Sequence, residues 1–416
     1  MLKVGFIGLG TISHENVLGY LNSPDAEIVA VCRREEAAAR QWLATYNLRQ
    51  ARYYQRVEEM LEKEDLDIVE ILTPHYLHCS QTVLCAQAGV KGISLQKPMA
   101  LNLRECDRII EICKEHHVKL KIYENFVFYP VYLKARELIA QGLIGELQSI
   151  RINTMSGIRE GAPWPWCWTP GSWSLDLSRS GVGPLVGDDG SHKFSLARWF
   201  MGRDFEKVGA WIDATTPLDA PALIRAKLKN APNECPKYAQ IDFSFSTKMA
   251  LPCDFWLDDF IEIVGERGIM WLNQCSAAGD REFFRGNQMS DSPVFPPIAV
   301  FINGRVETYL TDISPSERNW STSFVGSTRH FIKVMKEGGE PIYTGEEGRE
   351  IHRYVIAAFI SAQEGRDVHL DEITTVAEQE GKFRIRTNFC NLDHEFYRSG
   401  KGKGAQEKKT CDLIEI

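Results

Sequence analysis

The sequence lacks any long apolar run. No stretch approaches the roughly 18–20 uninterrupted apolar residues that a transmembrane helix needs. The start of the sequence also lacks the charged and apolar segments of a secretory signal, and it shows a strand-like pattern over Met1–Gly8. We therefore expect a cytoplasmic protein with no membrane partner.

An excess of positive charge is also absent. Lys and Arg number 48 against 56 Asp and Glu, which gives a formal net charge of −8. A balance of this sign disfavours wholesale binding to nucleic acid or to anionic membranes. We therefore expect no nucleic-acid partner. The sequence also shows no internal repeat or low-complexity domain.

Paired cysteine motifs are missing as well. The eleven cysteines are scattered along the chain and no C-x-x-C pair occurs, which predicts reduced, mostly buried thiols. His116 and His117 are adjacent, which is not ligand spacing, and no Cys or acidic motif stands near them. We expect both at the surface and predict no metal site.

What the sequence does contain is typical of a globular protein. Its 416 residues are 44% hydrophobic and 25% charged, which predicts two or three domains with an ample core.

A glycine-rich turn follows the first predicted strand. The chain reads Gly-Leu-Gly-Thr-Ile-Ser from Gly8 to Ser13, between a strand and a helical pattern through Val17, Leu18 and Leu21. Glycines at these positions allow a tight turn and close approach of a pyrophosphate, and Ser13 replaces the third glycine where only a small residue is needed. The predicted dinucleotide-binding residues here are Gly8, Gly10, Thr11, Ile12 and Ser13.

Two arginines follow the second predicted strand, Glu27–Cys32. An NAD site usually has an acidic residue at this point to hold the ribose 2′-hydroxyl, whereas Arg33 and Arg34 suit a 2′-phosphate. We predict NADP or NAD as cofactor, with NADP favoured. The alternative is that both arginines are surface residues facing Glu35 and Glu36.

Strands and helices alternate through the first third of the chain. Further strands are predicted at Asp67–Thr73, Gly92–Gln96 and Val118–Tyr123, which indicates an α/β, doubly wound parallel sheet of the Rossmann type. Ligands bind at the carboxyl ends of such strands. The candidate cofactor-binding residues that fall there are Thr73, Pro74, His75, His78, Gln96, Lys97 and Asn125.

Asp188 and His192 stand four residues apart where an apolar helical pattern begins. On a helix the two side chains share one face, and a carboxylate beside an imidazole suits proton transfer near neutral pH. The alternative is a plain helix start, with Asp188 or Asp189 as the cap.

Four motifs in register resemble those of the glucose–fructose oxidoreductase / inositol dehydrogenase family (Gfo/Idh/MocA). That family has an N-terminal G-x-G-x-x-(small) turn, then T-P-N-x-x-H, E-K-P and a D-x-x-x-H helix. This chain has the glycine turn, TPHYLH at 73–78, QKP at 96–98 and DDGSH at 188–192, so the likeness covers roughly residues 1–370. His75 replaces the usual Asn, and Gln96 replaces the usual Glu and so removes a negative charge beside Lys97.

The resemblance implies a second, α+β domain with a large, mostly antiparallel sheet. We predict a dinucleotide-binding domain at 1–124, a substrate-binding and oligomerisation domain at 125–370, and an extension at 371–416. A homodimer or homotetramer through the C-terminal sheet is expected. Residues 277–317, rich in Pro, Gly, Asn and Asp, predict a long excursion between strands.

A tryptophan-rich loop occupies Gly161–Trp173. Trp164 and Trp166 are candidate contacts for the C–H face of a sugar ring, and the alternative is an aromatic plug or a subunit contact.

The resemblance implies hydride transfer from a secondary hydroxyl of a sugar, cyclitol or glycoside to a nicotinamide. Predicted catalytic residues are Lys97, Asp188 and His192, without a choice of base between Lys97 and His192. Predicted substrate-binding residues are Lys97, Asn125, Trp164, Trp166, Asp188 and His192. Two alternatives remain: glycoside cleavage through transient oxidation with a retained NAD, and a ligand-sensing or structural protein on an inherited dinucleotide fold.

Overall fold

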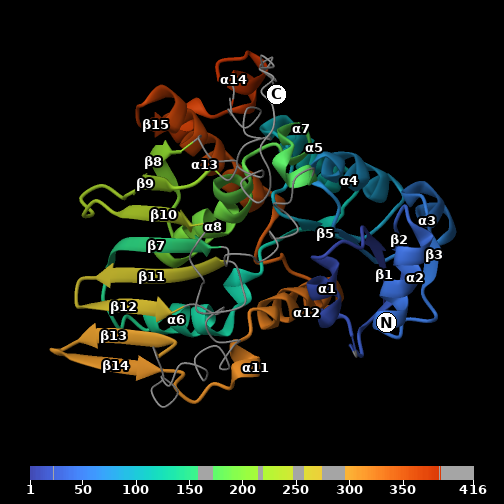
Figure 1. Cartoon of the computed structure of the whole chain (residues 1–416), viewed down its shortest axis with the longest axis horizontal. Helices are drawn as coiled ribbons and strands as arrows, with labels where there is room; N and C mark the ends of the chain where they lie inside the picture. The colour runs from blue at the N-terminus through green and yellow to red at the C-terminus, as the bar shows by residue number, and fades with distance from the viewer. Residues whose placement is uncertain are drawn as a thin grey trace, which may run out of the picture. The chain divides into compact units, whose positions relative to one another are not determined.

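The computed structural model describes residues 1–21, 23–157, 172–213, 219–246, 257–273, 296–383 and 385. The chain divides into two compact units, drawn in Figure 1. The first comprises Met1–Tyr129 and Trp320–His352, and the second comprises Pro130–Asn319 and Arg353–Ile416.

The first unit is built on six parallel strands in the order β3-β2-β1-β4-β5-β6. This is the order of a dinucleotide-binding fold, so the predicted doubly wound parallel sheet is confirmed. Its strands are β1 (Leu2–Ile7), β2 (Ala26–Cys32), β3 (Arg52–Tyr54), β4 (Ile68–Ile71), β5 (Gly92–Gln96) and β6 (Lys119–Tyr123). Its helices include α1 (Ser13–Asn16), η1 (Val17–Gly19), α2 (Glu36–Thr45), α3 (Val57–Lys63), η2 (His75–Leu77), α4 (His78–Gln87), α5 (Leu103–Glu115), η3 (Phe126–Phe128) and α12 (Ser321–Glu337).

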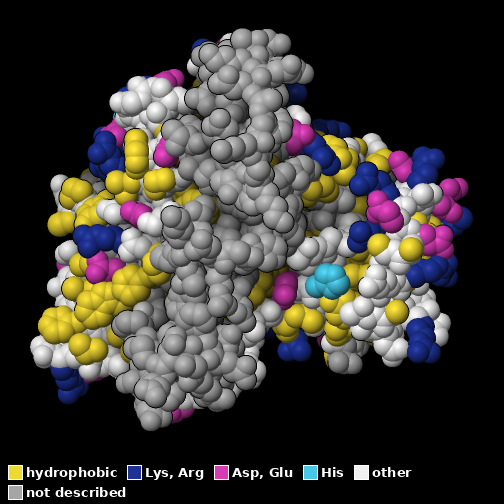
Figure 2. Space-filling model, in the orientation of Figure 1, with side chains coloured by type: hydrophobic (Ala, Val, Ile, Leu, Met, Phe, Trp, Pro, Cys, Tyr) yellow, Lys and Arg dark blue, Asp and Glu magenta, His cyan; other side chains and the backbone are white. Residues whose placement is uncertain are grey.

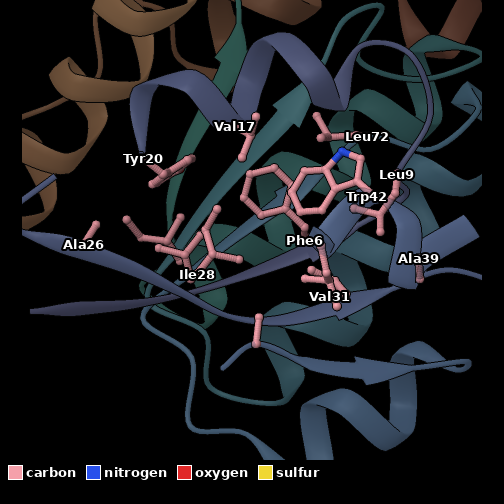
Figure 3. Close-up of a cluster of buried hydrophobic side chains, with 14 of the residues drawn as sticks. Phe6, Leu9, Val17, Tyr20, Ala26, Ile28, Val31, Ala39, Trp42 and Leu72 are labelled. Atoms are coloured by element: carbon pink, nitrogen blue, oxygen red, sulfur yellow. The ribbon is translucent and has the colours of Figure 1, made fainter. Parts of the chain in front are cut away.

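An aromatic group forms the core on one face of this sheet. Phe6 of β1 packs edge-on against Tyr20 and tilted against Trp42, with ring centroids 5.6 Å apart in both pairs (Figure 3). All three side chains are almost wholly buried. Phe331 and Ile332 of α12 belong to the same cluster, so a helix from late in the chain completes the core of the first unit.

Helix α12 is held to β6 by buried hydrogen bonds. Tyr123 Oη donates to the Phe324 carbonyl at 3.1 Å and lies 3.1 Å from Thr328 Oγ1. The predicted boundaries placed residues 320–352 with 125–370, whereas their contacts lie within the first unit. Residues 320–352 join the first unit through this long-range packing, which no local sequence pattern indicates. The boundaries of independently folding domains stay a prediction.

A polar row crosses the same sheet. Glu70 of β4, Ser94 of β5 and Lys121 of β6 are neighbours in register, and all three are buried. Tyr20 Oη donates to Glu70 Oε1 at 2.6 Å and Asn16 Nδ2 donates to Glu70 Oε2 at 3.1 Å. Burial raises the pKa of Glu70, and burial lowers the pKa of Lys121 to about 8 despite the attraction of Glu70.

The second unit contains a nine-stranded sheet in the order β14-β13-β12-β11-β7-β10-β9-β8-β15. Only β7 and β10 pair in parallel, so the predicted mostly antiparallel sheet is confirmed. The strands are β7 (Leu147–Gly157), β8 (Phe205–Ile212), β9 (Ala222–Leu228), β10 (Tyr238–Ser246), β11 (Leu257–Gly265), β12 (Gly268–Asn273), β13 (Ile298–Ile302), β14 (Arg305–Tyr309) and β15 (Val368–His369). Its helices are α6 (Pro130–Ala140), η5 (Trp173–Leu175), α7 (Leu177–Ser180), η6 (Pro184–Asp189), α8 (Gly190–Met201), α11 (Pro315–Arg318), η7 (Leu370–Glu372) and α14 (Thr375–Gln379), and α13 (Gly345–Glu364) has residues in both units.

The predicted excursion over residues 277–317 is wrong for its second half. Strands β13 and β14 pair as a hairpin there, and Asn303 (φ 52°) and Gly304 (φ +76°) form the two-residue turn. Asn-Gly is the strongest local signal for such a hairpin because both residues tolerate positive φ. The signal was in the sequence, and the high content of turn-forming residues obscured it.

Other predictions concern residue exposure. Of the six cysteines whose state is described, four are buried, as predicted, and none is in a disulfide. His116 and His117 are exposed, as predicted. Among the described residues, no helix combines the length and apolar character needed to cross a membrane.

Candidate functional site

The glycine turn lies at the centre of the first sheet, where the strand order reverses. Gly8 has φ +91°, and a Cβ there would meet the Leu72 carbonyl oxygen at 2.8 Å, so only glycine fits. The Gly8 amide donates to the Cys32 carbonyl at 3.0 Å, which fixes the turn against the end of β2. A Cβ on Gly10 would meet nothing within 4 Å, so the backbone at Gly10 is open to a ligand.

The residues after the turn start α1 as predicted. Thr11 is exposed, Ile12 is half-buried and Ser13 is buried. Ser13 Oγ donates to the Gly10 carbonyl at 2.6 Å, so the serine that replaces the third glycine also braces the turn. The helical pattern predicted through Leu21 is broken, because α1 gives way to η1 at Val17.

The two arginines after β2 have different surroundings. The Arg33 guanidinium donates to the Leu9 carbonyl inside the glycine turn and lies 3.3 Å from Glu35 Oε2. Arg34 is largely exposed, and its Nε is 4.0 Å from Glu35 Oε1. Arg33 is therefore held at the turn, whereas Arg34 fits the alternative surface interpretation better.

The loop after β4 is held by contacts of His78 and Thr73. His78 is fully buried; its Nε2 is 2.9 Å from the Thr73 carbonyl and its Nδ1 is 3.1 Å from the Pro98 carbonyl. Burial, with His75 nearby, lowers the pKa of His78 to about 3. Thr73 Oγ1 also donates to Gln81 Oε1 at 2.6 Å. Neutral His78 has one N–H, so it donates to one of these two carbonyls, and its ring lies between the loop after β4 and the loop after β5.

A second buried histidine makes the stability of the fold sensitive to acid. His352 is 3% exposed, and burial lowers its pKa to about 4, against 6.5 in an unfolded chain. Between those values the unfolded chain binds a proton that the folded chain does not, so the free energy of unfolding falls as pH falls from 6.5 towards 4. At pH 5 the loss from one such histidine is about 2 kcal/mol relative to pH 7.

We expect His352→Leu to reduce that pH dependence. Urea unfolding at pH 7 and pH 5 should show a smaller drop for this variant than for the unsubstituted protein, by about 2 kcal/mol. The exposed His116→Leu is the matched control and should keep the full drop. An equal drop in both variants would contradict a neutral His352.

Gln96 and Lys97 lie where β5 ends. Gln96 Oε1 accepts a hydrogen bond from the Lys97 amide at 2.9 Å, whereas Gln96 Nε2 is buried and makes no hydrogen bond to any described residue. Lys97 is half-buried. Gln96 therefore offers an unused N–H donor at this position, where the resemblance had led us to expect a carboxylate.

Asn125 has a structural partner. Its Nδ2 donates to Ser323 Oγ of α12 at 2.7 Å, and the residue is 2% exposed. Its carbonyl oxygen and the second Nδ2 hydrogen are left for a ligand. Its predicted cofactor and substrate roles stay predictions.

The Asp188–His192 pair belongs to the second unit. Asp188 lies in the π-helical turn η6 and His192 in the first turn of α8, which continues from η6 without a break. No side chain caps α8, so the helix-cap alternative for Asp188 and Asp189 is not what the structure shows. His192 is 7% exposed and Asp188 is half-buried.

Two carboxylates that the sequence did not single out fix this helical turn. Asp219 accepts hydrogen bonds from the amides of Leu185 at 2.8 Å, Val186 at 2.8 Å and Gly187 at 3.3 Å, so it caps the turn that carries Asp188. Asp259 Oδ2 lies 2.6 Å from Lys193 Nζ, and its Oδ1 accepts from Thr154 Oγ1 at 2.7 Å.

Lys193 also lies 3.3 Å from Asp189, and both Lys193 and Asp259 are fully buried. The residue next to His192 is therefore anchored to the sheet by a hydrogen-bonded ion pair. A lysine inside an otherwise apolar helical pattern was the available signal for it, and no local signal identifies Asp219. Trp164 and Trp166 lie outside the described residues.

The first unit fits a dinucleotide. The open Gly10, the Arg33 guanidinium at the turn and the unused Gln96 donor all lie at the carboxyl ends of β1, β2 and β5, where such a fold binds its ligand. A six-stranded parallel sheet with this turn at its switch point defines a dinucleotide-binding α/β fold.

Comparison with known proteins identifies the family. Residues 2–124 match the model of the oxidoreductase family with an NAD-binding Rossmann fold, Gfo/Idh/MocA, and residues 132–271 match the C-terminal domain of that family. The chain belongs to the Gfo/Idh/MocA family of NAD(P)-dependent oxidoreductases, as its four motifs predicted.

Its relatives include two dehydrogenases. D-apiose dehydrogenase of Paraburkholderia graminis is 26% identical over 90% of this chain and 91% of that protein. Myo-inositol 2-dehydrogenase of Thermotoga maritima is 24% identical over 89% of this chain and 99% of that protein. A glycosyl hydrolase family 109 protein of Parabacteroides distasonis is 29% identical, but the match covers 35% of this chain and 33% of that protein.

A solved structure shares the fold over nearly its whole length. An oxidoreductase from Agrobacterium radiobacter, in complex with NAD+, L-tartaric acid and magnesium, has a TM-score of 0.71 at 20% identity, over 90% of this chain and 99% of that chain.

Proposed function

We propose that this protein oxidises a secondary hydroxyl of a sugar, cyclitol or glycoside with NAD(P) as acceptor. The observation that carries the proposal is the glycine turn, open at Gly10, in a chain of an oxidoreductase family. The two relatives matched over most of their length are named as dehydrogenases of a sugar and of a cyclitol, which supports this substrate class.

The chain's own residues have separate tasks in this proposal. Residues 8–13, Arg33, the loop 73–78 and Gln96 hold the cofactor, whose nicotinamide supplies the hydride acceptor when bound. Lys97 donates a hydrogen bond to the substrate hydroxyl and eases loss of its proton. Asp188 orients His192, and either His192 or Lys97 takes the proton.

We propose NADP as the preferred cofactor because Arg33 is held at the glycine turn, where a 2′-phosphate would accept from a guanidinium. We expect Arg33→Asp to lower the ratio of kcat/KM for NADP to that for NAD by about 10–100-fold, the value of a charged hydrogen bond. Steady-state kinetics with both cofactors measures this ratio. Arg34→Asp makes the same charge change at an exposed position and should shift the ratio far less; equal shifts would remove Arg33 from this role.

The outer face of the second sheet is proposed to join copies of this chain. Large apolar side chains there are exposed: Trp211, Leu223, Tyr238, Phe301 and Val306. Hydrophobic side chains also gather over the strands of this sheet in Figure 2. Such a face is typical of an interface between protein chains. Light scattering should therefore give a mass of two or four chains.

We also propose that this assembly lies in the cytoplasm, because the described cysteines are unpaired.

The test of the function separates oxidation from glycoside cleavage. Purified protein is incubated with NADP or NAD and a panel of aldoses, inositols and aryl glycosides, while absorbance at the reduced-nicotinamide band and aglycone release are followed together. Stoichiometric cofactor reduction with a sugar or cyclitol supports the proposal. Aglycone release without net reduction would establish the retained-cofactor alternative, and neither signal with bound cofactor would favour a sensor.

A further inference from the structure

A basic hollow lies in the second unit, away from Asp188 and His192. It has a volume of about 600 Å³, and its lining includes Arg136, Arg198, Trp199, Arg203, Lys229 and Asn230. Gly202 ends α8, whereas His192 lies in the first turn of that helix. Ten residues of helix separate the two positions by about 15 Å, so the hollow is distinct from the proposed catalytic residues.

The charge of the lining is concentrated and positive. Four cationic side chains face one carboxylate, in a protein whose formal net charge is −8. Arg198 pairs with Asp204 at 2.8 Å and Arg203 pairs with Glu234 at 2.7 Å. Within the described parts of the chain, neither Arg136 nor Lys229 has a carboxylate within 4.0 Å, so two cations remain for an anion.

Arg136 is already placed for recognition. Its Nη1 donates to the Phe200 carbonyl at 2.8 Å, and its guanidinium carbon lies 5.6 Å from the centre of the Trp199 ring. These contacts fix the plane of the guanidinium and leave Nε and Nη2 without a described acceptor. A fixed planar fork binds the oxygens of a phosphate or carboxylate in pairs.

Completion of the helix end explains part of this cluster. Cations near a helix C-terminus offset its dipole, and Arg136 satisfies one terminal carbonyl. Stabilising the end of this helix requires neither Lys229 nor the hollow itself. It also leaves Asn230 Oδ1 unexplained, since this atom is buried and makes no hydrogen bond to any described residue.

The polar and aromatic lining adds to the charge. The amide of Asn230 matches a hydroxyl, which both donates and accepts, and the Trp199 indole offers a flat apolar face. We infer that this hollow binds a small polyol that carries a phosphate or carboxylate group, through Arg136 and Lys229 on the anion and Asn230 on a hydroxyl. The inference does not depend on which reaction the chain catalyses.

Isothermal titration calorimetry on the full-length protein tests it. Glucose 6-phosphate and gluconate are the anionic polyol probes, glucose lacks the anion and inorganic phosphate lacks the polyol. We expect saturable binding of at least one anionic polyol, weaker in high salt because the contact is ionic, and much weaker or no binding of glucose. If inorganic phosphate bound as tightly as glucose 6-phosphate, the inference that the hollow recognises a polyol would be wrong.

Variants assign the binding to this hollow. Lys229→Gln, at an exposed residue, should raise the Kd of the tighter probe by at least about fivefold, and Arg136→Lys, which keeps the charge but not the fork, should raise it similarly. Lys333→Gln makes the same charge change at an exposed site in α12 and should leave the Kd unchanged. Lys97→Ala should also retain binding, which separates the hollow from the catalytic residues. No saturable binding by either anionic polyol, or equal Kd values in Lys229→Gln and Lys333→Gln, would overturn the inference.

Discussion

Replacing Lys97 by alanine is expected to lower kcat by about 10²–10⁴-fold with the true substrate, while the Kd of the cofactor changes little. The reason is its place in the sheet, since Lys97 directly follows β5 at the edge where ligands of this fold bind. Stopped-flow or steady-state reduction of the cofactor gives kcat, and fluorescence titration gives the Kd.

Lys91 provides a matched control from the same strand. It directly precedes β5, at the opposite edge of the sheet, and pairs with Asp67 at 2.7 Å on an exposed surface. Lys91→Ala should keep kcat within a factor of about two to three, because an exposed ion pair contributes little. If Lys97→Ala keeps the kcat of Lys91→Ala, the proposed role of Lys97 is wrong.

His192→Ala should act on the same rate constant. We expect a loss of similar size in kcat with unchanged cofactor binding, and Asp188→Asn should give a smaller loss together with a shifted pH profile of kcat. His116→Ala is the exposed control. A normal pH profile and normal kcat in both site variants would exclude the pair from the reaction.

Removal of Glu70 is expected to destabilise the first unit by about 3–5 kcal/mol, the typical effect of breaking a buried charged network. Glu70→Leu leaves the hydroxyl of Tyr20 and the amide of Asn16 without their acceptor, and it removes the charge that attracts Lys121. Urea unfolding at pH 7 measures the change in the free energy of unfolding.

Lys121→Met should cost much less, about 1–2 kcal/mol, although it removes the other charge. Lys121 Nζ makes one long hydrogen bond, 3.4 Å to the Ser327 carbonyl, and its burial already disfavours the charged form. The ranking of the two single variants is the decisive result. A loss for Lys121→Met that equals the loss for Glu70→Leu would mean that the two groups form one tight ion pair.

The pH dependence gives an independent check. The pKa of Lys121 is about 8 in the fold and 10.5 when unperturbed, so between these values the unfolded chain holds the extra proton. This group therefore makes the free energy of unfolding rise with pH over that range. Lys121→Met should lack that rise.

Local patterns predicted the parts of the site that single segments build. The glycine turn and the strand ends at Thr73 and Lys97 follow from periodicity and from the conformational needs of glycine, so their places could be read directly. The Asp188–His192 spacing was equally local, although the π-helical turn around Asp188 depends on the distant Asp219.

Contacts over long sequence separations were not predictable. No local pattern indicates that the Asn125 amide donates to Ser323, 198 residues later. The basic hollow combines Arg136, the end of α8 and Lys229, and none of these segments alone has a binding motif. Side-chain chemistry suggests a role only once the tertiary neighbours are known.

Helix α12 also has a consequence for synthesis on the ribosome. Phe331 and Ile332 complete the apolar cluster around Phe6, and Tyr123 hydrogen-bonds to Phe324 of the same helix. The amino-terminal sheet therefore emerges long before α12, one of its covering helices, is translated. At about 5–20 residues per second, the roughly 200 intervening residues take ~10–40 s. During that interval the nascent chain exposes an apolar surface that a chaperone can bind.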